Sequence, residues 1–196
     1  MKPYISIDLE TTGIEPDDCQ ILEVGAVIDD LISPIESCPV FHTYVVHPQY
    51  KGEAYALSMH PKILRRIATR EPGFRYMPAD EVCGALADFA RQHDLDREHL
   101  LASGKNFGSF DLQFLKKLPY YKVFLGFKHR FLDPGMLYWE PTDDEPPNTK
   151  TCLERAGLPS DVKHEAVEDA KEIVQLVRIA WERRCQEIRR RQEIAA

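Results

Sequence analysis

Apolar and polar residues alternate along the N-terminal part of the chain. Residues 4–9, 21–28 and 39–46 are apolar-rich runs separated by short segments that contain proline, aspartate and serine. Alternation with a period of two, bounded by turn-forming residues, is typical of β-strands. Because the connections between the runs are short, the pattern predicts an antiparallel meander.

After residue 60 the apolar positions recur at helical spacing. Residues 78–93 carry Val82, Leu86 and Phe89 one turn apart and acids in the first turn, which is typical of an amphipathic helix. Further helices are predicted at 61–69, 109–118, 151–156 and 165–194, and short strands at 99–103 and 130–132. We therefore predict an α/β fold, a mixed sheet with helices packed on it, in a single domain over residues 1–196.

Composition excludes several classes of protein. Of 196 residues, 43% are hydrophobic and 29% charged, which excludes disordered and collagen-like chains. The formal net charge of −7 argues against a broad basic surface for nucleic acid, so such a substrate would need local groups or metal ions. No apolar run of about 18 residues predicts a membrane span. The five cysteines form no Cys-x-x-Cys pair, and we expect a cytoplasmic protein without a signal peptide.

Two acids lie near the end of the first predicted strand. Asp8 and Glu10, in Asp-Leu-Glu-Thr-Thr-Gly, are two residues apart, so their carboxylates point to the same side of the strand. Adjacent anions repel unless a proton or a cation lies between them. This pair alone leaves two interpretations open, a ligand pair or an exposed strand end whose acids face water.

Two further segments carry candidate residues at predicted helices, Asp111 in a first turn and Asp169 inside the long C-terminal helix. Asn106 begins and Asp111 ends the segment Asn-Phe-Gly-Ser-Phe-Asp. His164 and Asp169 lie in His-Glu-Ala-Val-Glu-Asp, where the long C-terminal helix starts. Each segment alone has a structural explanation, since the helix dipole favours acids there and a lone histidine is commonly solvated.

Together the three segments indicate a metal-dependent site. Asp8, Glu10, Asp111 and Asp169 supply hard oxygen ligands from separate parts of the chain, which suits Mg²⁺ or Mn²⁺ rather than Zn²⁺. His164 adds a side chain that exchanges a proton near neutral pH.

The motifs resemble those of the DEDDh exonucleases, the DnaQ-like group of the ribonuclease H-like superfamily. The resemblance rests on residues 8–13, 106–111 and 164–170 in this order. It implies a five-stranded mixed sheet with helices on both faces. It also implies that the four acids bind two divalent cations, Mg²⁺ or Mn²⁺, with Asp8 as the bridging ligand, and that His164 is the general base.

The resemblance extends to candidate substrate contacts. Contacts with the terminal nucleotide are expected from Thr11, Thr12, Asn106, Lys105, Leu57 and Met59. Lys105 stands where many members have a histidine and adds a positive charge near the substrate strand. Leu57 and Met59 occupy the position of an apolar wedge against the terminal bases, and simple core packing is their other interpretation.

The expected function is 3′-to-5′ exonucleolytic hydrolysis of single-stranded nucleic acid, with DNA as the first choice, releasing nucleoside 5′-monophosphates. The alternatives are an exoribonuclease of the oligoribonuclease or ribonuclease T type, an endonuclease of the wider superfamily, and a catalytically silent nucleic-acid-binding module. The expected partner is a single-stranded 3′ end, with no membrane. A polymerase or replication partner, and a monomer or a homodimer, are both left open.

Overall fold

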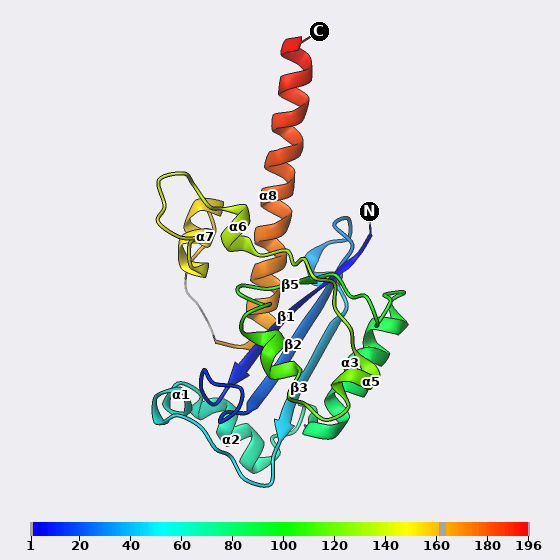
Figure 1. Ribbon diagram of the computed structural model, residues 1–196, viewed down its shortest axis with the longest axis vertical. Helices are drawn as coiled ribbons and strands as arrows, with labels where there is room; N and C mark the ends of the chain where they lie inside the picture. The colour runs from blue at the N-terminus through cyan, green and yellow to red at the C-terminus, as the bar shows by residue number, and fades with distance from the viewer. Residues whose placement is uncertain (1, 161–163, 196) are drawn as a thin grey trace.

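Five strands form one mixed sheet at the centre of the molecule (Figure 1). The computed structural model describes residues 2–160 and 164–195. The strands are β1 (Tyr4–Thr11), β2 (Ile21–Asp29), β3 (Val40–Val46), β4 (Tyr76–Pro78) and β5 (Ala102–Ser103), in the order β4-β3-β2-β1-β5. β1, β2 and β3 form the predicted antiparallel meander, and β4 and β5 add a parallel strand at each edge.

Helices cover both faces of this sheet, which confirms the predicted α/β architecture. α3 (Ala79–Gln92) and α4 (Asp111–Leu115) pack on one face, and α7 (Thr149–Ala156) and α8 (Ala166–Ala195) on the other. The remaining helices are η1 (Ile35–Ser37), α1 (Ala54–Met59), α2 (Pro61–Thr69), α5 (Tyr121–Phe124) and α6 (Pro134–Leu137).

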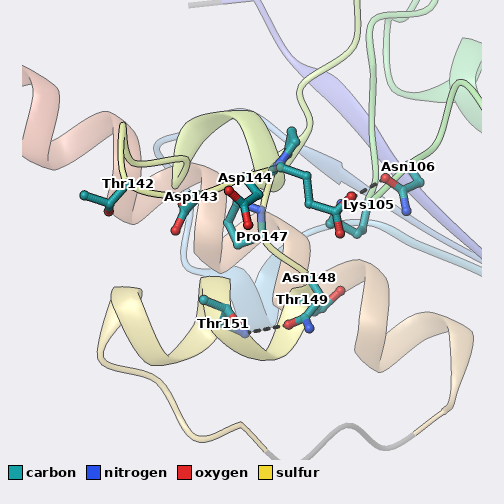
Figure 2. A pocket seen from close by; sticks show the side chains of 11 residues that line it. Lys105, Asn106, Thr142, Asp143, Asp144, Pro147, Asn148, Thr149 and Thr151 are labelled. Atoms are coloured by element: carbon teal, nitrogen blue, oxygen red, sulfur yellow. Dashed lines mark hydrogen bonds between the residues drawn. The ribbon is translucent and has the colours of Figure 1, made fainter.

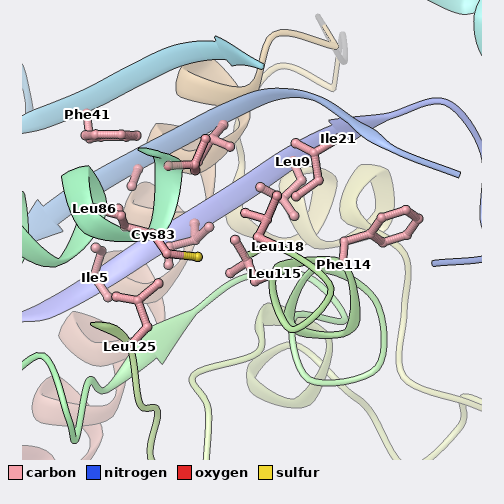
Figure 3. Packing of buried hydrophobic residues seen from close by; sticks show 14 of the residues in the cluster. Ile5, Leu9, Ile21, Phe41, Cys83, Leu86, Phe114, Leu115, Leu118 and Leu125 are labelled. Atoms are coloured by element: carbon pink, nitrogen blue, oxygen red, sulfur yellow. The ribbon is translucent and has the colours of Figure 1, made fainter. Parts of the chain in front are cut away.

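Alternation along β1 sends its side chains into two different cores. Ile5, Ile7 and Leu9 belong to the larger core, which α3 and α4 cover (Figure 3). Tyr4 belongs to the second core, beneath α7 and α8. Because successive residues of a strand face opposite sides, the acids at positions 8 and 10 share the face of Tyr4 and lie under α8.

Only the first part of α8 packs against the sheet. Ile173, Leu176 and Val177 are buried there, whereas the C-terminal part extends away from the body of the protein (Figure 1). The exposed residues of this part include Trp181 and Ile188. Within residues 2–160 and 164–195, no helix has both the length and the apolar character that crossing a membrane requires.

The sequence prediction misplaces the boundaries of four elements, one of which is the strand predicted at 99–103, where only Ala102–Ser103 forms β5. Tyr76–Pro78 forms β4, so the helix predicted at 78–93 begins after Pro78. The helix predicted at 109–118 is confined to α4. Of the strand predicted at 130–132, only a bridge between Ser103 and Leu132 forms.

Three short helices are absent from the sequence prediction, although Asp133 and Pro134 form a typical helix start at α6. α1 has 6 residues, and α5 and α6 have 4 each. Segments this short contain too few apolar positions to show a helical period. The helix predicted at 165–194 is confirmed as α8, since 30 residues show the period clearly.

Candidate metal centre

The first two motifs meet at the end of β1. Glu10 is buried and Asp8 is half-buried on the face of β1 beneath α8. Asp111, the first residue of α4, is also buried. Its Oδ1 accepts a hydrogen bond from the backbone N–H of Leu9 at 3.1 Å. This bond fixes the start of α4 against the strand that carries the acids.

The start of α8 brings the third motif to the same place. Candidate ligand atoms of Glu10, His164 and Asp169 all lie within 4.8 Å of one another. His164 is exposed and has a φ of 50°, a left-handed conformation just before the helix. Asp8 and Asp111 lie outside this tight group, yet the charges of Asp111, Glu10 and Asp169 all act on Asp8.

Burial raises the pKa of all four acids, and the charges of other acids raise those of Asp8 and Glu10 further. Burial, followed by the charges of Asp169 and Glu23, raises the pKa of Glu10 to about 8. Burial is also the largest cause for Asp111, whose pKa rises to about 8, and for Asp169, whose pKa rises to about 7. Burial and then the charge of Asp111 raise the pKa of Asp8 well above its ordinary value. Carboxylates perturbed together in this way are typical of functional sites.

The donor set fits a hard divalent cation. Oδ1 of Asp169 is buried and has no hydrogen-bond partner in the described part of the chain. A cation bound by carboxylates would satisfy this oxygen and would favour the ionised form of the acids around it. Oxygen-rich ligand sets of this kind suit Mg²⁺ or Mn²⁺.

Two neighbours of the acids are residues that sequence reasoning missed. Nε2 of His60 lies 3.4 Å from Oε2 of Glu10. Glu23 is the direct cross-strand partner of Glu10. Its Oε1 lies 2.6 Å from Nε2 of His42. No motif marks these residues. Only the register of β1 against β2 would have revealed Glu23, and the sequence leaves this register undetermined.

The threonines of the first motif hold the turn that follows β1. Oγ1 of Thr11 donates to the carbonyl of Gly13 at 2.7 Å. Oγ1 of Thr12 donates to the carbonyl of Lys51 at 2.5 Å and accepts from the N–H of Gln20 at 2.8 Å. Both hydroxyls are thus engaged inside the protein, and the N–H of Thr12 donates to the carbonyl of Gln20 at 2.9 Å, so a nucleotide contact at these positions stays a prediction.

Lys105 and Asn106 line a pocket of about 830 Å³ whose lining includes none of the four acids (Figure 2). The opposite wall is the proline- and acid-rich segment 142–149. Nζ of Lys105 donates to Oδ1 of Asn106 at 2.9 Å, and the N–H of Asn106 donates to Oδ2 of Asp133 at 2.9 Å. The two candidates therefore lie together, and their contact with substrate stays a prediction.

The candidate wedge residues lie on α1, which ends just before His60. Met59 is 40% exposed and Leu57 is half-buried. None of the residues of α1 is buried, so the core-packing interpretation is wrong for Met59. Because His60 contacts Glu10, this helix ends beside the acids, and its contact with terminal bases stays a prediction.

Solved nuclease structures share this fold. E. coli exonuclease I in complex with a dT13 oligonucleotide has a TM-score of 0.66 and 15% identity over 96% of this chain. The zinc-bound E. coli exonuclease I complex with single-stranded DNA has a TM-score of 0.67 and 14% identity over 95% of this chain. The Neurospora crassa Pan2 catalytic unit, a protease and nuclease domain, has a TM-score of 0.62 and 13% identity over 95%.

The likeness is one of fold rather than of sequence. This chain spans 43% of the first exonuclease I chain, 42% of the second and 28% of the Pan2 chain. No family model matches the sequence, and no curated protein matches it. The common fold is the α/β architecture with a five-stranded mixed sheet that these exonucleases use.

Proposed function

We propose that this chain is a metal-dependent exonuclease that removes nucleoside 5′-monophosphates from the 3′ end of single-stranded nucleic acid, with DNA as the preferred substrate. The observation that carries the proposal is the convergence of Glu10, His164 and Asp169 within 4.8 Å, from opposite ends of the chain. The fold shared with an oligonucleotide complex of exonuclease I supports it. The 3′-to-5′ direction rests on the resemblance of the motifs to those of DEDDh exonucleases.

The four acids are the proposed ligands of two divalent cations, Mg²⁺ or Mn²⁺. When bound, the cations would lower the pKa of a water molecule and offset the charge that develops on the phosphate. Without them, Asp8, Glu10, Asp111 and Asp169 repel a polyanion, and the net charge of −7 adds to this repulsion. Substrate binding should therefore depend on the cation.

His164 is the proposed general base, which accepts a proton from the attacking water. Imidazole is suited to this task because it changes charge near neutral pH. The exposure of His164 lets the ring return the proton to solvent. Candidate ligand atoms of Glu10 and Asp169 lie within 4.8 Å of the ring, which places the proposed base beside the acids.

Substrate contacts are proposed from two parts of the fold. One comprises Thr11 at the end of β1, Thr12 directly after it, and the side chains of Leu57 and Met59 on α1. The other comprises Lys105 and Asn106, which would contact the substrate strand.

The test is a nuclease assay with 5′-labelled linear substrates and an internally labelled closed DNA circle. We expect single-stranded DNA to shorten from its 3′ end in Mg²⁺, and neither a chelator-treated sample nor Asp8→Asn to do so. Cleavage of a closed DNA circle would instead identify an endonuclease. Faster degradation of RNA of the same sequence would identify an exoribonuclease, and cation-dependent binding without cleavage would identify a silent binding module.

A further inference from the structure

Glu23 is a buried carboxylate that the proposed mechanism does not use. It lies on β2 directly opposite Glu10 on β1 and is 3% exposed. Gly25, two residues along, faces Ala166 at the start of α8, so Glu23 points to the same side of the sheet, where the acids lie. Like charges on directly opposed residues of neighbouring strands destabilise a sheet, so this pair calls for an explanation.

One carboxylate oxygen of Glu23 contacts His42, and the other has no hydrogen-bond partner among the described residues. Oε1 lies 2.6 Å from Nε2 of His42 on β3. The ring of His42 packs edge-on against Tyr44, with centroids 4.8 Å apart, and against Phe74 at 6.0 Å. Oε2 is buried and has no hydrogen-bond partner among the residues that the structure describes. A buried carboxylate with a purely structural role would be expected to have both oxygens hydrogen-bonded.

Glu23 lies beside the candidate metal ligands in the sheet. It is the direct cross-strand partner of Glu10, and a candidate ligand atom of Glu10 lies within 4.8 Å of those of His164 and Asp169. A buried carboxylate beside these acids adds negative charge that favours a cation among them.

We propose that Glu23, held in place by His42, is a positioning residue that strengthens the binding of divalent cations by Asp8, Glu10 and Asp169. This inference rests on the proposed function in one respect, that these acids bind a cation. Glu23 adds negative charge behind the ligands without being one of them. Outer-shell partners of this kind typically change metal affinity by about 10–100-fold.

The test measures the Kd of Mn²⁺ for the full chain by electron paramagnetic resonance of the free ion, without substrate. We expect Glu23→Gln, which keeps the shape and removes the charge, to raise the Kd about 10-fold. The matched control is Glu98→Gln, the same change at an exposed residue that pairs with Arg97, and its Kd should equal that of the wild type. An unchanged Kd in Glu23→Gln, or an equal rise in the control, would overturn the inference.

A second pair of variants keeps the test decisive if Glu23→Gln does not fold. His42→Ala removes the donor that holds Glu23 and should weaken Mn²⁺ binding, whereas His42→Gln keeps a donor and should restore most of the affinity. Equal Kd values for both variants and the wild type would contradict a positioning role.

Asp169→Asn separates the two proposals. If it leaves Mn²⁺ binding unchanged, the proposed metal centre itself is wrong. If it abolishes binding while the Glu23 and His42 variants bind like the wild type, only the inference about Glu23 is wrong.

Discussion

Gly25 on β2 lies directly beneath Ala166, the first residue of α8. A Cβ atom on Gly25 would stand 2.3 Å from the carbonyl carbon of Ala166 and 2.4 Å from the N of Val167. Backbone atoms cannot yield to such a contact as a flexible side chain can. The missing side chain of Gly25 thus sets how closely α8 approaches the sheet, and so how close Asp169 comes to Glu10.

We expect Gly25→Ala to destabilise the protein by about 1–3 kcal/mol, the usual cost of overpacking, and to weaken Mn²⁺ binding because the start of α8 is displaced. Urea unfolding and a Mn²⁺ titration measure the two effects. The matched control is Gly84→Ala in α3, where a new Cβ would meet its nearest neighbour, Phe124, only at 3.8 Å. This control should gain roughly 0.5–1 kcal/mol, because glycine is a poor residue for a helix interior. Equal stability of Gly25→Ala and the wild type would show that α8 adjusts freely.

His164→Ala separates a general base from a metal ligand. A positioned base contributes about 10²–10⁴-fold to a rate, so we expect kcat on a single-stranded oligonucleotide to fall by this factor. The Kd of Mn²⁺ should stay close to that of the wild type, because the four acids remain. If the Kd rises in proportion to the loss of activity, His164 binds the cation and the base lies elsewhere.

The raised pKa values predict how stability without metal depends on pH. Unfolded, glutamate and aspartate ionise near pH 4, whereas the fold raises the pKa of Glu10 to about 8 and that of Asp169 to about 7. Between about pH 4 and the raised pKa values, the folded state therefore binds more protons than the unfolded state. The contribution of these groups to stability is therefore fully present below about pH 4 and is lost as the pH rises through their folded pKa values.

Thermal unfolding in chelator checks this prediction. We expect the Tm of the wild type to fall between pH 6 and pH 8 more steeply than that of the double variant Glu10→Gln with Asp169→Asn, which lacks the two groups. Cation affinity should rise over the same range, since protons and cations compete for the carboxylates. Parallel Tm profiles for the two proteins would contradict the pKa values on which the prediction rests.

A buried ion pair away from the site gives a stability prediction. Arg178 on α8 donates to the carboxylate of Asp29, which is fully buried at the end of β2, with Nε at 3.1 Å from Oδ1. Arg178→Met leaves this carboxylate without its cation, and we expect a loss of about 3–5 kcal/mol in urea unfolding. Arg184→Met removes an exposed pair with Glu187 and should cost at most about 1 kcal/mol. Similar losses in both variants would show that burial of the Asp29 pair is unimportant.

The longer helices and strands could be predicted because each contains enough residues for its hydrophobic period to be recognised. Alternation in residues 4–9 and the apolar run at 21–28 predicted β1 and β2, and apolar residues at helical spacing between Ile173 and Ala180 predicted α8. β4 has 3 residues and β5 has 2, so their place in the sheet depends on packing rather than on local pattern.

The acids could be chosen from the sequence because their motifs are local. The strand period puts Asp8 and Glu10 on one face, and the helix start marks Asp169. Glu23 and His60 could not be found in this way, because their relation to Glu10 depends on strand register and on how α1 and α2 meet the sheet. Charge neighbours from other strands emerge only in the folded chain.

The most direct test of the metal centre is anomalous diffraction at the manganese edge from a crystal of the full chain soaked in Mn²⁺. We predict anomalous density among the carboxylates of Asp8, Glu10 and Asp169, absent from crystals of Asp169→Asn treated in the same way. Manganese bound elsewhere, or no anomalous density in the wild type at saturating Mn²⁺, would contradict the proposal that these acids form the catalytic metal site.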